Sequence, residues 1–340
     1  MRWRPTVLRP HVTLIERDRQ PQALAIGRLD VAPLECKFGY KVVYRPTVRL
    51  LFFQPVLFRS ESLHVTRTLI REFMVCLARG EADVVKLHRI ELDSPLHRAV
   101  SDIPPWFARE HFAQRETRRL LQVPDSIEEF LASRSHKVRG HIRNLENRSG
   151  KKYGARLSLT VFQSLDDIDR MFADLNSIAS EAYQRRLGVA FPNTEEARNA
   201  IPFALERGWF RAYVLYVDAE PVAYSAGFLY NKTFNYTSVG YKPAYASDSF
   251  GRFLLGRIIA DLCRDDAVQV MDYGSGDADY KRRFSNRSSE HVHPLIFACV
   301  FRAVRINIIR TAIKVAAAPA EEALRRTGLR ARVKKRRRKG

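Results

Sequence analysis

Residues 271–284, MDYGSGDADYKRRF, bring several titratable side chains together around a turn. The segment ends an apolar run, and its two glycines permit a tight bend of the backbone. Side chains that transfer protons in enzymes are mostly acids, bases and phenols. Residues 272–281 offer all three types, so they predict a catalytic group made of Asp272, Asp277, Tyr280 and Lys281.

The same residues also have a purely structural interpretation. Asp277 is well placed to cap the N-terminus of a short helix that starts at Ala278. Asp272 could accept hydrogen bonds from the amides of the turn. The basic residues 281–283 could form a solvated face of that helix. The residue types alone leave both interpretations open.

A second candidate site precedes the helix expected over residues 252–263. Ser247, Ser249 and Gly251 are small, so a ligand can approach the backbone there closely. The first amides of a helix are unpaired, and together with the helix dipole they can bind phosphate. Arg252 could add positive charge at the rim. Any capped helix begins in a similar way, so a structural role is the alternative.

A third candidate is a basic helix expected over residues 130–152. His136, Arg139 and Arg143 are spaced i, i+3 and i+7, which places them on one helix face. That face could bind an anion or could simply be solvated.

Metal ligands and disulfides are not indicated. His291 and His293 alternate onto one face of the last expected strand, but two histidines without a third ligand do not predict a metal site. The four cysteines are scattered and form no C-x-x-C pair, which is typical of reduced thiols in the cytosol. No metal is predicted.

The elements that must position these residues follow from hydrophobic periodicity. Strand patterns at 209–217, 221–230 and 233–241 are separated by short turns and predict an antiparallel meander. Two helices with capping signals at Ser164 and Asn193 precede it. In the first 120 residues, a hairpin around Asp18, a helix and further strands indicate a mixed α/β region: residues 11–31, 63–80 and 84–92.

The order of these elements resembles that of the GNAT acyltransferases. Residues from about 130 to 300 resemble the branch of CelD-like and BioF2-like acetyltransferases, which is related to the FemAB-type aminoacyltransferases. The resemblance lies in D-x-G-x-G-D-x-x-Y-K, which runs from Asp272 to Lys281, and is supported by the helix with Arg139 and Arg143. At Tyr245–Gly251, Ser-Phe-Gly stands where relatives usually have Ser-Pro-Gly, and the fuller acetyl-CoA loop pattern is lacking.

This resemblance implies an α/β (α+β) chain of two GNAT-like halves with mixed, mainly antiparallel sheets. The expected domains are a degenerate first half, a catalytic domain, an amphipathic helical extension and a disordered basic tail: residues 1–125, 126–300, 301–324 and 325–340.

The resemblance also implies an acyltransferase that moves an acyl group, foremost acetyl, from acyl-CoA to an amine or hydroxyl acceptor. An envelope saccharide or exopolysaccharide precursor is the expected acceptor. Asp272 or Asp277 would then be the base, and Tyr280 would protonate the leaving thiolate or bind the oxyanion, with Lys281 lowering its pKa. The other expected roles are CoA binding and substrate binding: Ser247, Ser249, Gly251 and Arg252 for the first, Arg139 and Arg143 for the second.

One geometric expectation connects these assignments. The bend after residue 273 and the helix start near residue 252 should open onto a shared cleft. Two alternatives remain: transfer of an amino acid from aminoacyl-tRNA, and a basic module without catalysis that binds RNA or a membrane.

The net charge of the chain indicates which kinds of partner it attracts. The chain of 340 residues carries +21, and residues 325–340 contribute ten Lys or Arg and no acid. Such a segment attracts polyanions, either RNA or an anionic membrane. The helical pattern at 302–318 is amphipathic, with Arg302, Arg305, Arg310 and Lys314 over about half the circumference. A cytoplasmic protein is expected, which could lie at the inner face of the membrane.

Overall fold

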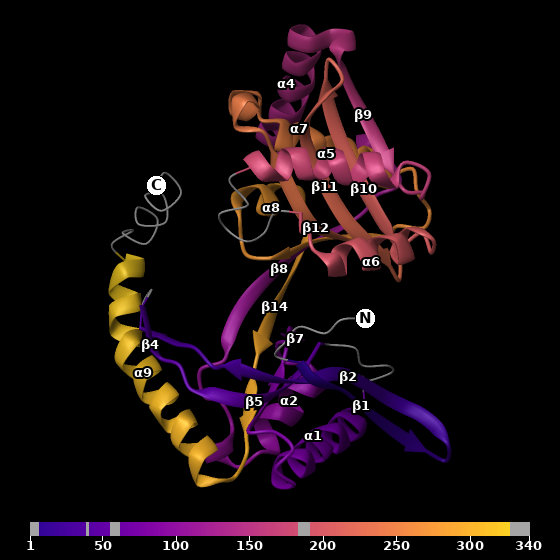
Figure 1. Ribbon diagram of the computed structural model, residues 1–340. Coiled ribbons are helices and arrows are strands. Elements are labelled where there is room, and N and C mark those ends of the chain that lie inside the picture. Colours follow the sequence, from indigo (N-terminus) through magenta and orange to yellow (C-terminus); the bar gives the residue numbers. More distant parts are fainter. Residues whose placement is uncertain (1–6, 39–40, 55–61, 183–190, 327–340) are drawn as a thin grey trace. The chain divides into compact units, whose positions relative to one another are not determined.

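The computed structural model describes residues 7–38, 41–54, 62–182 and 191–326, without the side chains of 320–326. The chain folds into two compact units (Figure 1). Unit 1 is built from residues 117–289, and unit 2 combines the segments 2–116 and 290–340. Unit 2 is thus assembled from both ends of the chain, whereas the sequence pattern placed boundaries at 125 and 300. The basic tail from residue 327 on lies outside the described residues.

Unit 1 contains a mixed sheet with the strand order β8-β13-β12-β11-β10-β9. The expected meander is present, and each of its two-residue turns has positive φ at both positions: Asp218 and Ala219, then Asn231 and Lys232. This is the hairpin geometry that matches the twist of the flanking strands. The strands are β8 (Gln114–Gln122), β9 (Leu157–Phe162), β10 (Phe210–Val217), β11 (Glu220–Tyr230), β12 (Thr233–Tyr241) and β13 (Val270–Ser275).

Helices cover both faces of this sheet. Apolar residues of α4 and α7 pack in one core cluster, and those of α5 and α6 pack in another on the opposite face (Figure 1). The basic helix expected at 130–152 is in fact two helices, because Ser135 ends the connection and caps the second. The helices are α3 (Ile127–Ala132), α4 (His136–Tyr153), α5 (Ile168–Glu181), α6 (Glu195–Leu205), α7 (Phe250–Leu262) and α8 (Asp279–Phe284).

Two expected helix caps are shifted. Thr194, not Asn193, caps α6, with its hydroxyl accepting from the amide of Ala197. The capping box at Ser164 does not form, because this hydroxyl donates to the Asp166 carboxylate instead. Both helices are where the pattern predicts, since the apolar face decides packing and the cap only sets the first turn.

Strands β12 and β13 are parallel and pair over a short stretch. Thr233 to Asn235 stand opposite Val270 to Asp272, and β12 then continues to Tyr241 without β13 as a partner. Parallel strands end at the same edge of a sheet. Both strands therefore run toward the same edge of unit 1, but the glycine turn leaves β13 beside Tyr236, before β12 ends at Tyr241.

Unit 2 has a five-stranded sheet with the order β1-β2-β5-β6-β15, in which only β5 and β6 are parallel. The expected hairpin turns at Asp18 and Arg19, and the helix α1 packs Phe73 against Phe53 in the core. Its main elements are β1 (Val7–Arg17), β2 (Gln20–Pro33), β5 (Thr47–Phe53), α1 (Leu63–Ala78), β6 (Val84–Leu87) and β15 (Leu295–Phe297).

Smaller elements complete unit 2. The strand expected at 84–92 is interrupted at Arg89, whose φ of 59° turns the chain between β6 and β7. The smaller elements are β3 (Cys36–Phe38), β4 (Lys41–Tyr44), β7 (Ile90–Glu91), α2 (Pro95–Asp102) and β14 (Arg287–His293). The long helix α9 (Phe301–Arg326) is the last element of the unit. The α/β class with mainly antiparallel sheets is confirmed; the GNAT-like ancestry of the first half stays a prediction.

The long helix α9 packs on unit 2 rather than extending from it. Asn307 donates to the carbonyls of Phe107 and Arg109, both at 2.9 Å. Arg310 pairs with Glu110 at 3.0 Å. Across the described ranges of the chain, no helix combines the length and the apolar character needed to cross a bilayer.

Candidate active site

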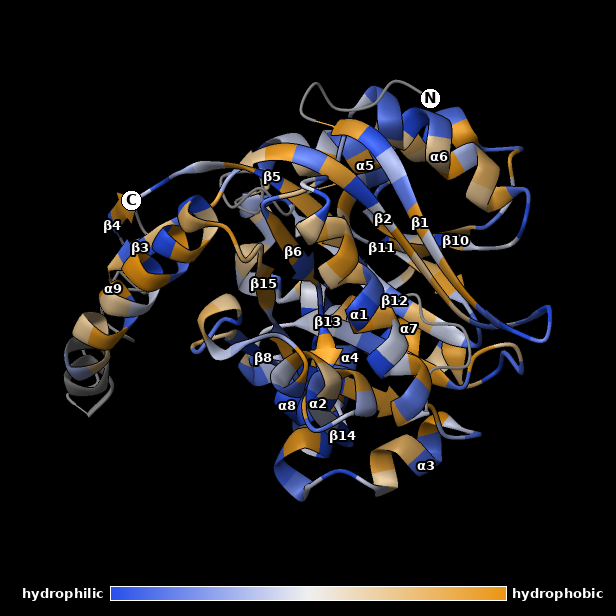
Figure 2. Ribbon diagram, turned by 90° about the horizontal axis from the view of Figure 1, so that it is seen from below, coloured by the Kyte–Doolittle hydropathy of each residue, from blue (hydrophilic) through white to orange (hydrophobic). Residues whose placement is uncertain are grey.

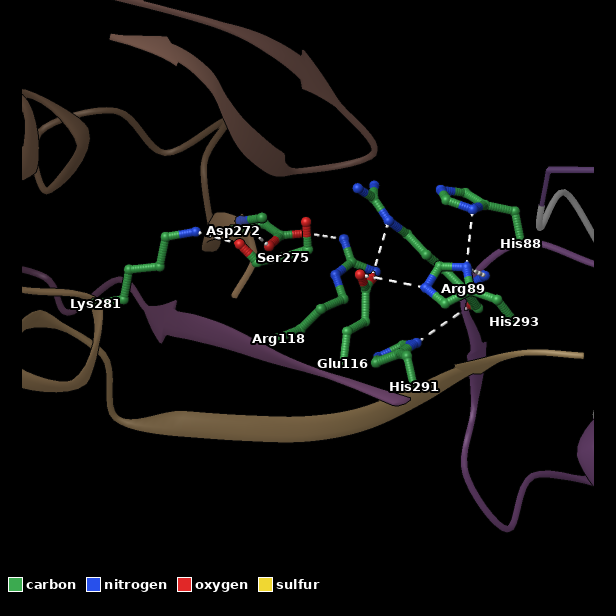
Figure 3. Close-up of polar contacts among 10 residues, drawn as sticks. His88, Arg89, Glu116, Arg118, Asp272, Ser275, Lys281, His291 and His293 are labelled. Carbon is green, nitrogen blue, oxygen red and sulfur yellow. Dashed lines mark hydrogen bonds and ion pairs between the residues drawn. The ribbon is translucent and has the colours of Figure 1, made fainter. Parts of the chain in front are cut away.

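The turn after β13 is fixed by Asp272. The glycines Gly274 and Gly276 have φ of 70° and 92°, which side chains rarely allow. Asp272 is 2% exposed, and its carboxylate accepts from the amide of Gly274 at 2.8 Å. The same carboxylate pairs with Arg118 on β8, as Figure 3 shows. Asp272 therefore holds the backbone of the turn and compensates the charge of the partly buried Arg118.

Lys281 fastens the other end of the turn. Its side chain is buried, and its ammonium donates to the carbonyl of Ser275 at 2.7 Å (Figure 3). Ser275 is the last residue of β13, so the bond ties α8 to the strand end. The expected effect of Lys281 on the pKa of Tyr280 stays a prediction.

Asp277 does not cap α8, which corrects the structural interpretation given above. The N-cap residue is Ala278, without a side-chain cap. The Asp277 carboxylate instead lies 2.9 Å from Arg119 and 3.6 Å from Arg282. Two guanidinium groups attract this partly exposed carboxylate more strongly than the amides of a six-residue helix, because full charges interact more strongly than partial ones.

Tyr280 lies beside two buried tyrosines. The rings of Tyr236 and Tyr273 are 6.1 Å apart, and Tyr280 packs against the same core cluster while staying partly accessible. Burial raises the pKa of Tyr236 and Tyr273 above the ordinary value, and the nearby Tyr280 raises it further. These phenols stay protonated at neutral pH, so they can donate hydrogen bonds but cannot act as bases.

The loop before α7 is held by basic residues of α4. Lys152 pairs with the buried Asp248 at 2.7 Å, and Arg148 donates to the carbonyl of Ser247 at 2.8 Å. Ser249 is the N-cap, with φ of 59° and no side-chain cap. Gly251 and Arg252 are exposed. Within the described part of the chain, Arg252 has no side-chain partner.

His141 on α4 connects the two candidate sites. Its pKa is lowered, first by burial and then by the positive charges of Arg252, Arg283 and Arg148. Arg252 belongs to the start of α7 and Arg283 to the helix that carries Tyr280, so both act on one imidazole. Its Nε2 atom is buried and has no hydrogen-bond partner among the described residues. Basic residues of both sequence motifs therefore act on this imidazole through their charge.

The sequence pattern did not single out His141, because only the helix face with His136, Arg139 and Arg143 was considered. His136, Arg139 and Arg143 lie on a face that the structure leaves largely exposed. Arg139 donates to the carbonyl of Ala132 at 3.3 Å, which ties α4 to the end of α3. Arg143 is exposed and has no side-chain partner within the described residues. A search for a half-buried polar residue on the inner face would have found His141.

Unit 2 holds a separate polar cluster. The amide of Arg89 donates to His293 Nδ1 at 3.3 Å, so this atom is unprotonated. The proton of His293 is then on Nε2, which faces Glu116 at 3.2 Å, and His88 Nδ1 lies 2.9 Å from His293 Nδ1 (Figure 3). Burial, followed by the His293 charge, lowers the pKa of His88 to about 4.

The imidazoles of His88 and His293 are neutral at physiological pH, because burial lowers the pKa of both. His291 also belongs to this cluster, through a contact of 3.2 Å with the carbonyl of Arg89. A group of three or more side chains suited to a metal ion is absent from the described residues.

Comparison with known proteins agrees with the motif. Residues 136–282 match a model of the acetyltransferase (GNAT) domain. No curated protein sequence matches the chain.

The fold of the chain is similar to that of several solved structures. FemX has a TM-score of 0.60 with 10% identity, covering 87% of this chain and 90% of that one. The C-terminal domain (DUF2156) of a putative lysylphosphatidylglycerol synthetase from Agrobacterium fabrum has a TM-score of 0.54 with 12% identity, covering 90% and 89%. L-PGS from Bacillus licheniformis has 0.53 with 12% identity, covering 89% and 88%. Residues 136–282 are therefore similar to the acetyltransferase (GNAT) domain, and the fold of the chain is similar to that of FemX.

Proposed function

We propose that this protein transfers an acyl group from acyl-CoA to an amine or hydroxyl acceptor. The observation that carries the proposal is the convergence at His141. Arg252 from the start of α7 and Arg283 from the helix of Tyr280 both lower the pKa of this imidazole. A phosphate-binding helix start and a proton-donating phenol are then parts of one site, as acyl transfer from a phosphorylated donor requires.

The donor end of this site is the N-terminus of α7. The first turn of α7 has no acidic residue, and the nearby Asp248 is neutralised by Lys152. A side chain added at Gly251 would meet only the ring of Tyr241, at 3.8 Å, so the backbone there is accessible. Helix amides, the helix dipole and Arg252 together favour a phosphate group at this point.

The reacting end is the phenol of Tyr280. An attacking amine loses a proton when the new bond to the acyl carbon forms, and the thiolate of CoA gains one when it leaves. The pKa of the neighbouring Tyr236 is raised, so its phenol stays protonated and adds no negative charge beside Tyr280. Tyr280 suits protonation of the leaving thiolate or a hydrogen bond to the oxyanion. Asp272 and Asp277 are both paired with arginine, which favours a positioning role over that of the base.

Aminoacyl transfer is the second candidate, and a specific observation favours it. Helix α4 carries six Lys or Arg and one acid, and it lies beside the start of α7. The fold is similar to that of FemX and of a domain of a putative lysylphosphatidylglycerol synthetase. The end of an aminoacyl-tRNA carries phosphates that such a basic helix attracts. An envelope acceptor is consistent with both candidates.

Thermal unfolding in the presence of CoA or acetyl-CoA tests the donor. A ligand at a hundred times its Kd should stabilise the fold by about 2.7 kcal/mol and raise Tm. Arg252→Ala should reduce this shift. Arg264→Ala is the matched control, because Arg264 is also exposed but follows the opposite end of α7.

The outcomes separate the two candidates. A Tm shift by CoA that depends on Arg252 and not on Arg264 supports acyl-CoA as the donor. The absence of any shift by CoA, with salt-sensitive binding of aminoacyl-tRNA, would favour aminoacyl transfer. Equal loss of the shift in both variants would remove α7 as the donor site.

A further inference from the structure

The rotation of α9 on unit 2 is set by polar residues. Arg310 is 8% exposed and pairs with Glu110, and it also donates to the carbonyl of Glu35 at 3.0 Å. Asn307 is 2% exposed and donates to two carbonyls of the segment before β8. Burial raises the pKa of Glu110, and Arg310 opposes this shift. These bonds are lost if the helix rotates, so they fix which side faces outward.

The outward side of α9 is mostly apolar. Phe301, Ile308 and Val315 are 82%, 59% and 54% exposed, and they follow each other at intervals of seven residues. Such residues lie on nearly the same face of a helix. Arg305 and Ala312 are exposed between them, at the positions i+4 and i+11. We call the four apolar residues of this side, Phe301, Ile308, Ala312 and Val315, the outer stripe. Figure 2 shows hydrophobic and hydrophilic residues alternating along α9.

The charge around the outer stripe has one sign. Residues 301–320 contain no acid, and Arg302 and Arg305 are exposed beside Phe301. The Arg305 guanidinium lies 5.9 Å from the centre of the Phe301 ring. Ten further Lys or Arg and no acid follow at residues 325–340. An apolar stripe with basic flanks is typical of helices that lie in the surface of an anionic bilayer.

We propose that α9 docks this protein on an anionic lipid surface. The outer stripe, about 21 Å long from Phe301 to Val315 at 1.5 Å per residue, enters the boundary between headgroups and acyl chains. Arg305 remains at the level of the lipid phosphates, while Arg302 donates to the carbonyl of Thr47 at 3.0 Å. The proposal does not depend on which acyl donor the site takes.

The apolar residues favour a lipid surface over a nucleic acid. A polynucleotide backbone would neutralise the basic residues but leave Ile308 and Val315 in water. A bilayer removes both from water and offers negative charge at the same depth. The exposed aliphatic side chains and the cations then have partners at one surface.

Vesicle co-sedimentation of the full chain tests the proposal. The probes are phosphatidylcholine vesicles with and without phosphatidylglycerol. We expect binding to the anionic vesicles that weakens as salt rises. The double variant Ile308→Ser/Val315→Ser should bind them at least about tenfold more weakly, because two aliphatic side chains no longer enter the bilayer.

The matched control is Val12→Ser/Leu14→Ser on β1. These residues are 59% and 48% exposed, close to the values of Ile308 and Val315, but they are not on α9. Circular dichroism and Tm should be unchanged in both double variants, since all four side chains are exposed. Normal binding by the β1 variant supports docking through the outer stripe.

Three results would overturn the proposal. The first is no difference in sedimentation between anionic and neutral vesicles. The second is undiminished binding by the α9 variant, which would leave docking to the basic tail alone. The third is competition by tRNA together with weaker tRNA binding by the α9 variant, which would make the stripe part of a nucleic-acid surface.

Discussion

Units 1 and 2 each contain a largely buried acid paired with arginine beside a residue of positive φ. In unit 1 these are Asp272, Arg118 and Gly274, with φ of 70° at the glycine. In unit 2 they are Glu116 and Arg89, which itself has φ of 59°. The same types of group therefore appear at a turn in both units.

The two acids differ in their other partner. Asp272 accepts from a backbone amide of its turn, whereas Glu116 faces the imidazole of His293. A carboxylate that accepts from a backbone amide fixes the backbone, and the amide does not change its protonation state. A carboxylate beside an imidazole fixes a tautomer, and the network can titrate. Unit 1 thus builds a rigid turn beside Tyr280, and unit 2 a network that responds to acid.

The largest expected effect is that of Asp272→Asn on stability. The amide oxygen can still accept from Gly274, but the partly buried Arg118 loses the charge of the buried Asp272. We expect the free energy of unfolding to fall by about 3–5 kcal/mol, measured by urea denaturation. Glu116→Gln should cost less, because Gln still accepts from His293 and Arg89 is more exposed than Arg118. Equal losses of unfolding free energy would mean that Asp272 and Glu116 stabilise the fold to the same extent.

Tyr280→Phe in unit 1 should lower activity, whereas a histidine variant in unit 2 should not. Loss of one hydrogen bond to an oxyanion or a leaving group lowers kcat by roughly 100-fold. The fold should be unaffected, since the phenol is partly accessible. Tyr230→Phe, an exposed tyrosine of the same unit, and His88→Gln in unit 2 are the controls. A loss of kcat in His88→Gln as large as in Tyr280→Phe would contradict a reacting site confined to unit 1.

The acid response of unit 2 should appear in stability against pH. The pKa of His88 is about 4 in the folded chain and about 6.5 when unfolded, so the unfolded chain binds more protons between these values. Stability should therefore fall as pH decreases from 6.5 to 4. The half-buried ring is screened by solvent, so we expect about 1–2 kcal/mol. His88→Gln should flatten the curve in this window; an unchanged curve would rule out His88 as the source.

The smallest expected effect is that of Gly274→Ala. The added methyl would meet only the carbonyl of Tyr236, at 3.9 Å, so the cost comes from the positive φ. We expect a loss of about 1 kcal/mol in the free energy of unfolding. Gly150→Ala on α4, where φ is helical and nothing lies within 4 Å, should be neutral or stabilising. A loss in the control of the same size would show that backbone strain is not the cause.

The sequence by itself determined the elements and the motif of unit 1. The turns at Asp218 and Asn231 and the apolar faces of α5 and α6 depend on neighbouring residues, so local patterns predict them. The glycine turn after β13 follows from the same local chemistry. The motif from Asp272 to Lys281 also indicated the GNAT domain that the comparison found.

Only the tertiary structure decided how the side chains are used. Asp272 meets Arg118, and Arg310 meets Glu110, across long stretches of sequence that no periodicity connects. Arg310, which the helical pattern grouped with Arg302 and Arg305, is therefore buried, whereas Ile308 is exposed. His141 became a candidate only because Arg252 and Arg283, which are distant in sequence, both lower its pKa. Charged and polar side chains choose partners by distance in space, and that distance is fixed only when the strands and helices pack.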